Sequence, residues 1–366
     1  MSTSHAMPRS AWIFPGLAVL LFAATAIPSL GIGFTHSIQG LVFAGVLLVI
    51  LFGTVFAAVH HAEVIAERIG EPFGTLLLTL AVTVIEVALI MTLMLGEQEV
   101  PTLARDTVFS VVMIVCNGLV GACILVGGLR YREQEFQITG VNVYLCVLTV
   151  FATITLVLPN YTLETPGPVY SHLQLGFVSV VTIILYGVFL YTQTIRHRDY
   201  FIGGQRDGEG HVVASGGVLV VSCVLLIVSL VAVVLLAKKF SLVVDAGAAM
   251  IGAPPAFAGV VVAMLVLLPE SIAALSAARK NDLQKSINLA LGSSLATIGL
   301  TIPAVSEAAY LFDKTLVLGL PSRDIALLAM TMLVSMMTFG TGRTNILFGM
   351  VHLVVFAVFL LLVFVP

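Results

Sequence analysis

Two glutamates lie inside long apolar runs of this 366-residue chain, where a charge is costly. Glu86 lies within Phe73–Leu95 and Glu270 within Phe257–Leu275. A charged side chain at the centre of a bilayer costs about 2.5–3.5 kcal/mol even on lenient scales, and such residues usually serve a function. We therefore interpret the two acids as halves of one cation-binding site at the middle of a membrane.

The residues around these acids offer oxygen atoms. Thr83 precedes Glu86 by three positions and shares its helix face. Pro269 has no backbone N–H, which frees the carbonyl of Leu265. An all-oxygen site suits a hard cation such as Ca²⁺. The candidate ligands are Glu86, Glu270, Thr83, Asn117, Ser293 and the carbonyl of Leu265.

Charge then predicts proton coupling at Glu86 and Glu270. Two carboxylates are neutralised by one divalent ion or by two protons, whereas the empty pair carries two negative charges in a low dielectric. The protein exchanges a cation for protons if only these neutral forms can switch between the inward-facing and the outward-facing state. The expected transported ions are Ca²⁺ (with Na⁺ or K⁺ as alternatives) and H⁺.

Composition supports a membrane protein. The chain is 59% hydrophobic and 10% charged, whereas a soluble protein has about 25% charged residues. The expected partners are a lipid bilayer, inorganic cations and protons. There is no basic stripe for nucleic acid. No G-x-x-x-x-G-K-[ST] loop is present, so we expect that ATP is not the energy source. No nucleophile–base pair or two-His zinc spacing appears, so we expect a transporter and not an enzyme, and we expect no cofactor.

The hydropathy pattern predicts an all-α integral membrane protein. With about 20 residues per crossing, we count about eleven transmembrane helices. Their approximate ranges are 12–30, 41–60, 73–95, 107–128, 139–158, 173–193, 214–237, 255–277, 286–306, 322–339 and 344–365.

Basic residues indicate the orientation. With the N-terminus in the cytoplasm and the C-terminus outside, eleven of the 16 Lys and Arg residues fall on the cytoplasmic side. The other side holds Arg105, Lys238, Lys239, Lys314 and Arg323. We expect a bacterial inner membrane. The first helix either stays in the protein or is a cleaved signal peptide, because Ala24-Thr25-Ala26 resembles a cleavage site.

An internal repeat links the two halves. Glu63 and Asp245 each precede a glycine by seven residues, and each glycine is followed by a proline and then by the run that holds a glutamate. The third and eighth helices must run in opposite directions, as in inverted-repeat transporters. We expect 1–38 to hold the first helix, 39–195 and 214–366 to form five-helix repeats, and 196–213 to be a cytoplasmic linker.

Polar residues near the helix ends predict an access path. His60, Glu63 and Glu67 share one face at the end of the second helix, and Asp245 is the repeat mate of Glu63. These residues either collect cations and relay protons or form a solvated helix end, with Arg68 as a partner.

Several strings resemble a known family. They include HAEVIAERIGEPFGTLLLTLAVTVIEVALI, RDTVFSVVMIVCNGLVG, LLPESIAAL, NLALGSSLATIGLTIPAV and FGTGRTNILFG. The chain is similar to the cation/Ca²⁺ exchanger superfamily, in its Ca²⁺/H⁺ antiporter branch, and more specifically resembles bacterial ChaA-type antiporters. The resemblance implies that Glu86 and Glu270 bind Ca²⁺ and protons, and that Gly292-Ser293 opens a second conserved helix.

Other functions remain as alternatives. The asparagine that precedes each acid in plant and fungal exchangers is replaced here, by Val82-Thr83-Val84-Ile85 before Glu86 and by Val266-Leu267-Leu268-Pro269 before Glu270. A Na⁺/H⁺ or K⁺/H⁺ antiporter with little Ca²⁺ activity is therefore an alternative, and a cation channel is a weaker one. The sequence leaves the oligomeric state open, with a homo-oligomer among the alternatives.

Overall fold

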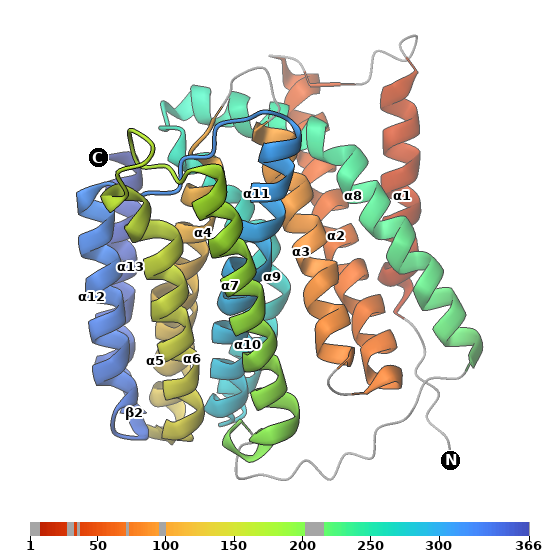
Figure 1. Cartoon of the computed structure of the whole chain (residues 1–366). Helices are drawn as coiled ribbons and strands as arrows, with labels where there is room; N and C mark the ends of the chain where they lie inside the picture. The colour runs from red at the N-terminus through yellow and green to blue at the C-terminus, as the bar shows by residue number, and fades with distance from the viewer. Residues whose placement is uncertain are drawn as a thin grey trace, which may run out of the picture. The chain divides into compact units, whose positions relative to one another are not determined.

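The fold is built almost entirely from helices. The structure is a computed structural model that describes residues 8–27, 33–34, 37–70, 73–94, 100–201 and 216–365. Within these ranges, eleven helices are long and apolar enough to cross a membrane, which confirms the predicted fold class. Figure 1 shows these helices. They are Arg9–Ala26, Ile38–Ile69, Phe73–Met94, Leu103–Tyr131, Ile138–Tyr161, His172–Arg196, Gly216–Ile251, Ala256–Arg279, Leu283–Leu311, Ser322–Phe339 and Ile346–Phe364.

The labels follow chain order. The first three are α1, α2 and α3, and the seventh and eighth are α8 and α9. The fourth consists of α4 (Leu103–Met113), a π-helical turn η2 (Ile114–Leu119) and α5 (Val120–Tyr131). The ninth consists of α10 (Leu283–Ala296), a π-helical turn η7 (Thr297–Thr301) and α11 (Ile302–Leu311). The others are α6 (Ile138–Ala152), α7 (His172–Tyr191), α12 (Ser322–Phe339) and α13 (Ile346–Phe364).

Helix α8 is longer than predicted. The seventh span was expected at 214–237, but α8 continues through Lys238 and Lys239 to Ile251. The sequence between Lys239 and Gly252 contains no proline, and long lysine stems can lie along apolar surface while their ammonium groups reach water. The helix ends where Gly252 adopts a φ of 64°.

The two sequence motifs of the predicted repeat share one local conformation. Helix α2 ends at Gly70, whose φ is 75°, and α8 ends at Gly252, whose φ is 64°. Both angles lie in the left-handed region, which glycine adopts without penalty at a helix C-terminus. The next helices begin at Phe73 and Ala256. Pro72, part of the predicted motif, lies outside the described residues.

The chain folds as two compact units, each drawing on both halves of the sequence. Unit 1 covers 1–99 and 208–252, and unit 2 covers 100–207 and 253–366. Unit 1 therefore holds α1, α2, α3 and α8, and unit 2 holds the other helices. Of the predicted linker 196–213, residues 202–213 lie outside the described part of the chain.

In unit 1, the additional helix α1 packs against α2 and α8. The His61 side chain is buried, with Nε2 3.0 Å from the Ala11 carbonyl oxygen of α1 and Nδ1 3.4 Å from Ser222 Oγ of α8. The Phe14 ring covers Gly53 so closely that no Cβ would fit there. One buried imidazole thus connects all three helices.

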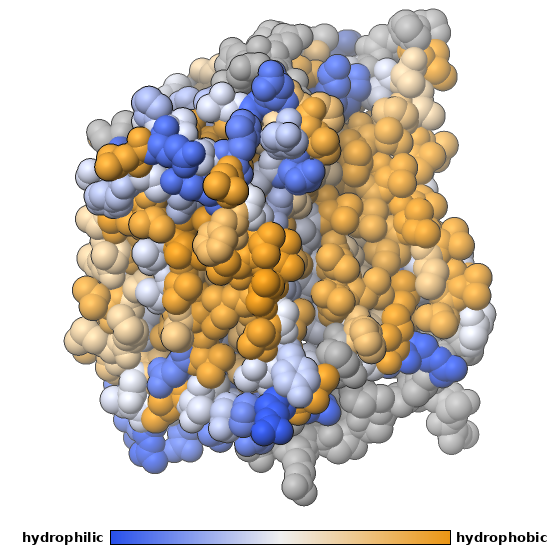
Figure 2. Space-filling view, viewed as in Figure 1, coloured by the Kyte–Doolittle hydropathy of each residue, from blue (hydrophilic) through white to orange (hydrophobic). Residues whose placement is uncertain are grey.

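In unit 2, a two-stranded ribbon ties two helix connections together. Strand β1 (Glu133–Glu135) pairs antiparallel with β2 (Arg343–Asn345). The buried Gln134 side chain donates from Nε2 to the carbonyl oxygen of Ala278, at the end of α9. Over α7 and its neighbours in this unit, hydrophobic side chains form a band with hydrophilic residues beyond both of its edges (Figure 2).

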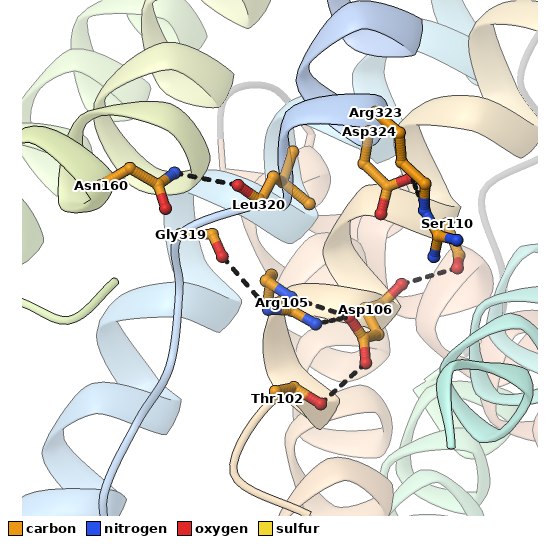
Figure 3. A network of polar contacts seen from close by, with 9 residues as sticks. All are labelled: Thr102, Arg105, Asp106, Ser110, Asn160, Gly319, Leu320, Arg323 and Asp324. Carbon is orange, nitrogen blue, oxygen red and sulfur yellow. Dashed lines mark hydrogen bonds and ion pairs between the residues drawn. The ribbon is translucent and has the colours of Figure 1, made fainter. Parts of the chain in front are cut away.

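A second set of contacts holds the segment 314–321, which precedes α12 (Figure 3). Arg105 Nη1 donates to the Gly319 carbonyl at 3.1 Å, and Asn160 Nδ2 donates to the Leu320 carbonyl at 3.0 Å. Arg105 also pairs with Asp106 at 2.8 Å, and Thr102 Oγ1 donates to the same carboxylate. These bonds join the start of α4 to the loop before α12.

Gly319→Ala tests this attachment. A Cβ at Gly319 would lie 2.6 Å from Asn160 Oδ1 and 2.7 Å from Pro168 Cβ. We expect a loss of about 1–3 kcal/mol of stability from overpacking, measured as a lower Tm in detergent. Gly187→Ala is the control, because nothing lies within 4 Å of its added Cβ. Equal Tm values for the two variants would show that the segment is not held rigidly.

Candidate functional site

Glu86 lies in the middle of α3, in unit 1, and is 1% exposed. Thr83, one turn earlier, is also buried and donates its hydroxyl to the Thr79 carbonyl at 2.9 Å. A hydroxyl that donates to its own helix keeps oxygen lone pairs for another partner. Thr83 can therefore serve as a neutral oxygen ligand beside the Glu86 carboxylate.

Glu270 lies in α9, in unit 2, and is half-buried. Its helix is fixed to its neighbours at two points along its length. At Gly259 it crosses α4 so closely that a Cβ would lie 2.8 Å from the Thr107 backbone nitrogen. Beyond Glu270, Ser286 Oγ of α10 donates to the Ala274 carbonyl at 2.7 Å. These contacts fix the position of the backbone that carries the acid.

Leu265 and Pro269 precede Glu270 within α9, and both are buried. The helix continues through Pro269 from Ala256 to Arg279. Proline cannot donate to the carbonyl four residues earlier, so the Leu265 oxygen lacks its usual helical partner. This geometry is compatible with the predicted use of that oxygen as a ligand.

Ser293 is half-buried in α10, within the same unit as Glu270. Its carbonyl, like that of Ser294, accepts from the N–H of Thr297, where the π-helical turn η7 begins. The turn η2 interrupts the repeat-related helix near Asn117. Such π-helical turns occur frequently at functional sites, and the periodicity of the sequence gave no sign of them.

Asn117 is fully buried, and its amide already has two partners. Nδ2 donates to Thr331 Oγ1 of α12 at 2.9 Å, and Oδ1 lies 3.2 Å from Nδ1 of His352 in α13. An amide oxygen has two lone pairs, so one remains for a cation. The sequence-based prediction included Asn117 but missed both of its partners.

The predicted access residues all belong to unit 1. Glu63 and Glu67 are exposed on α2, and Asp245 is exposed on α8, where Ser241 Oγ donates to it at 3.4 Å. His60 is half-buried and lines a groove with residues of α1 that include Ala11 and Phe14.

The predicted ligands thus fall into two groups. Unit 1 contains Glu86 and Thr83, and unit 2 contains Glu270, Leu265, Asn117 and Ser293. Each group pairs one carboxylate with neutral oxygen atoms. Inside helices of this length and hydropathy, such groups are typical of membrane proteins that move ions.

Comparison with known proteins defines the class further. Residues 36–195 and 221–365 match the family described as sodium/calcium exchanger protein. The chain therefore belongs to this family of membrane transporters and is not an enzyme. The two matched segments contain Glu86 and Glu270, respectively.

Two relatives match nearly end to end. "Putative ionic transporter y4hA" of Sinorhizobium fredii (strain NBRC 101917 / NGR234) is 43% identical over 372 residues, which cover 98% of this chain and 97% of the relative. Sodium-potassium/proton antiporter ChaA of Escherichia coli (strain K12) is 36% identical, with 96% and 95% covered. The predicted resemblance to ChaA-type antiporters is confirmed.

A solved structure shares the fold. The native structure of YfkE superposes with a TM-score of 0.73 at 18% identity, covering 97% of this chain and 100% of that one. At this identity the likeness concerns the fold alone. The selenium-substituted form of the same protein is described as a Ca²⁺/H⁺ antiporter.

Gly259→Ala tests whether the crossing of α4 and α9 positions Glu270. Because the added Cβ would meet backbone atoms at 2.8 Å, the two helices must separate. We expect cation-driven flux in reconstituted vesicles to fall about tenfold, since small displacements of functional groups are costly. Gly247→Ala is the control, with nothing within 4 Å of its Cβ. Unchanged flux in Gly259→Ala would contradict a positional role for this crossing.

Proposed function

We propose that this protein is a secondary antiporter that exchanges Ca²⁺ for protons, with Glu86 and Glu270 alternately binding the cation and H⁺. The observation that carries the proposal is a nearly inaccessible glutamate, Glu86, inside a membrane-length helix of a cation exchanger family member. Glu270 lies in α9, which the sequence pairs with α3 in the predicted repeat.

Electrostatics supplies the coupling. Two carboxylates and one Ca²⁺ have no net charge, and the same carboxylates with two protons also have none. The empty dianion is costly in a low-dielectric interior, so it holds a cation or recruits protons. Thr83, Asn117, Ser293 and the Leu265 carbonyl would contribute neutral oxygen ligands, as Ca²⁺ prefers.

Na⁺ or K⁺ is the second candidate cargo. The observation that favours it is the 36% identity to a sodium-potassium/proton antiporter, which exceeds the 18% identity to the structure described as a Ca²⁺/H⁺ antiporter. The same charge balance allows one monovalent cation and one proton to neutralise the pair.

The bias in basic residues supports an orientation for this exchange. We place the protein in a bacterial inner membrane with a cytoplasmic N-terminus and an external C-terminus. His60, Glu63 and Glu67 would then line the cytoplasmic entrance and Asp245 the opposite one. The inward proton gradient would drive cation export.

Glu86→Gln and Glu270→Gln test the roles of the acids. Each change removes the charge but keeps the shape, and loss of a charged partner from a buried ion costs about 2–5 kcal/mol. We expect cation-driven proton flux in vesicles to fall at least about 30-fold in either variant. Glu307→Gln is the matched control, because Glu307 is an exposed carboxylate on α11.

The controls make this experiment decisive. Each variant is also measured for yield and Tm in detergent, so that a folding defect is separated from a transport defect. Exchange at the wild-type rate in either Glu86→Gln or Glu270→Gln would remove that residue from the mechanism.

A cation panel separates the candidate cargoes. Vesicles with an internal pH dye receive Ca²⁺, Na⁺, K⁺ or Mg²⁺ separately, and the ion that moves protons is the cargo. If Ca²⁺ enters the cycle only as a neutral complex, its exchange should not respond to an imposed membrane potential. Cation uptake without any opposing proton flux would instead favour a channel.

A further inference from the structure

A chain of buried hydrogen bonds in unit 2 centres on His352 of α13. The imidazole is fully buried, with Nδ1 3.2 Å from Asn117 Oδ1 and Nε2 3.0 Å from Thr338 Oγ1 of α12. Asn117 and Thr338 are also fully buried. Asn117, which lies 235 residues before His352 in the sequence, therefore meets the consecutive helices α12 and α13 at one ring.

The partners determine which ring nitrogen carries the proton. Asn117 Nδ2 donates to Thr331 Oγ1 at 2.9 Å, which orients the amide so that Oδ1 faces His352. An amide oxygen can only accept, so Nδ1 must carry the hydrogen. Nε2 is then the acceptor for the Thr338 hydroxyl. The neutral imidazole thus has a partner for both nitrogens.

The same ring contacts the π-helical turn η2. The N–H of Val120 bonds to the carbonyls of Val115 and Asn117 and bypasses the Cys116 carbonyl between them. His352 therefore binds this turn through the side chain of Asn117 within it.

Two glycines allow this close approach. A Cβ on Gly121 of α5 would lie 3.0 Å from both the Gly349 carbonyl oxygen and His352 Cβ, and a Cβ on Gly349 would lie 2.8 Å from the Leu125 nitrogen. Small residues at a membrane helix crossing let backbones approach and polar side chains reach across. The turn η2 in turn packs against α9, the helix that carries Glu270.

We propose that His352 is a positioning residue for the cation site: it orients the Asn117 amide oxygen and holds the π-helical turn that packs against α9. This inference rests on the proposed exchange function. His352 itself need not bind the cation or carry the transported proton. Its effect is on cation affinity, because the ring supplies one fixed hydrogen-bond donor at Nδ1 and one fixed acceptor at Nε2.

His352→Leu and His352→Gln separate positioning from packing. Leucine removes both ring nitrogens, whereas glutamine offers one donor and one acceptor at a similar separation. We expect His352→Leu to raise the KM for Ca²⁺ about tenfold, because residues that orient metal ligands have effects of this size. The maximal rate should stay within about twofold of wild type. His352→Gln should restore KM to within about twofold of wild type.

Two further variants keep the test decisive. Val355→Ala shortens a buried side chain of the same helix and should lower Tm without changing KM. Thr338→Val removes the donor to Nε2 and should raise KM in the same direction, and it replaces His352→Leu if that variant does not fold. If the cation panel selects Na⁺ or K⁺, that ion replaces Ca²⁺ as the probe.

Three results would overturn the proposal. One is an unchanged KM in folded His352→Leu or Thr338→Val. Another is a His352→Gln variant as impaired as His352→Leu, and the third is a loss of all exchange in His352→Gln, which would make His352 a proton carrier. Each is distinguishable from failure of the exchange function, which would appear as wild-type flux in Glu86→Gln or Glu270→Gln.

Discussion

The interior of a bilayer offers no hydrogen-bond partner, and this constraint governs the polar groups inside the membrane-length helices. Most buried polar side chains meet it locally: Thr83 donates to Thr79 in its own helix, and Ser286 donates to Ala274 of the adjacent helix. A carboxylate cannot be neutralised by such donors, because its charge remains. In the proposed exchange, Glu86 and Glu270 balance their charge with a cation or a proton.

When no ion is bound, neutral polar groups near such acids must be kept in position by contacts within the protein. Helix α9 is fixed by the Gly259 crossing on one side of Glu270 and by Ser286 on the other. Asn117 is held by Thr331 and His352. Ligands fixed in advance lose little entropy on binding, so these contacts would favour cation affinity under the proposed function.

The features that could be predicted from the sequence are those that local residue patterns encode. The number of helices follows from apolar runs, the two acids stand out within them, and Gly70 and Gly252 mark equivalent helix ends. The partners of Asn117 could not be predicted, because His352 lies 235 residues away in sequence and no periodicity relates the two. Likewise, π-helical turns and the extension of α8 past Lys239 depend on tertiary packing.

Charge balance alone does not select the cargo, since one Ca²⁺, or one Na⁺ with one proton, neutralises two carboxylates equally well. Selectivity must come from the number and spacing of neutral oxygens, because Ca²⁺ takes six to eight ligands in a flexible shell. Two carboxylates can supply at most four oxygens. In the proposed site, neutral groups would provide the rest. A side chain that holds one of them, as we propose for His352 and Asn117, would then affect discrimination between cations more than the proton step.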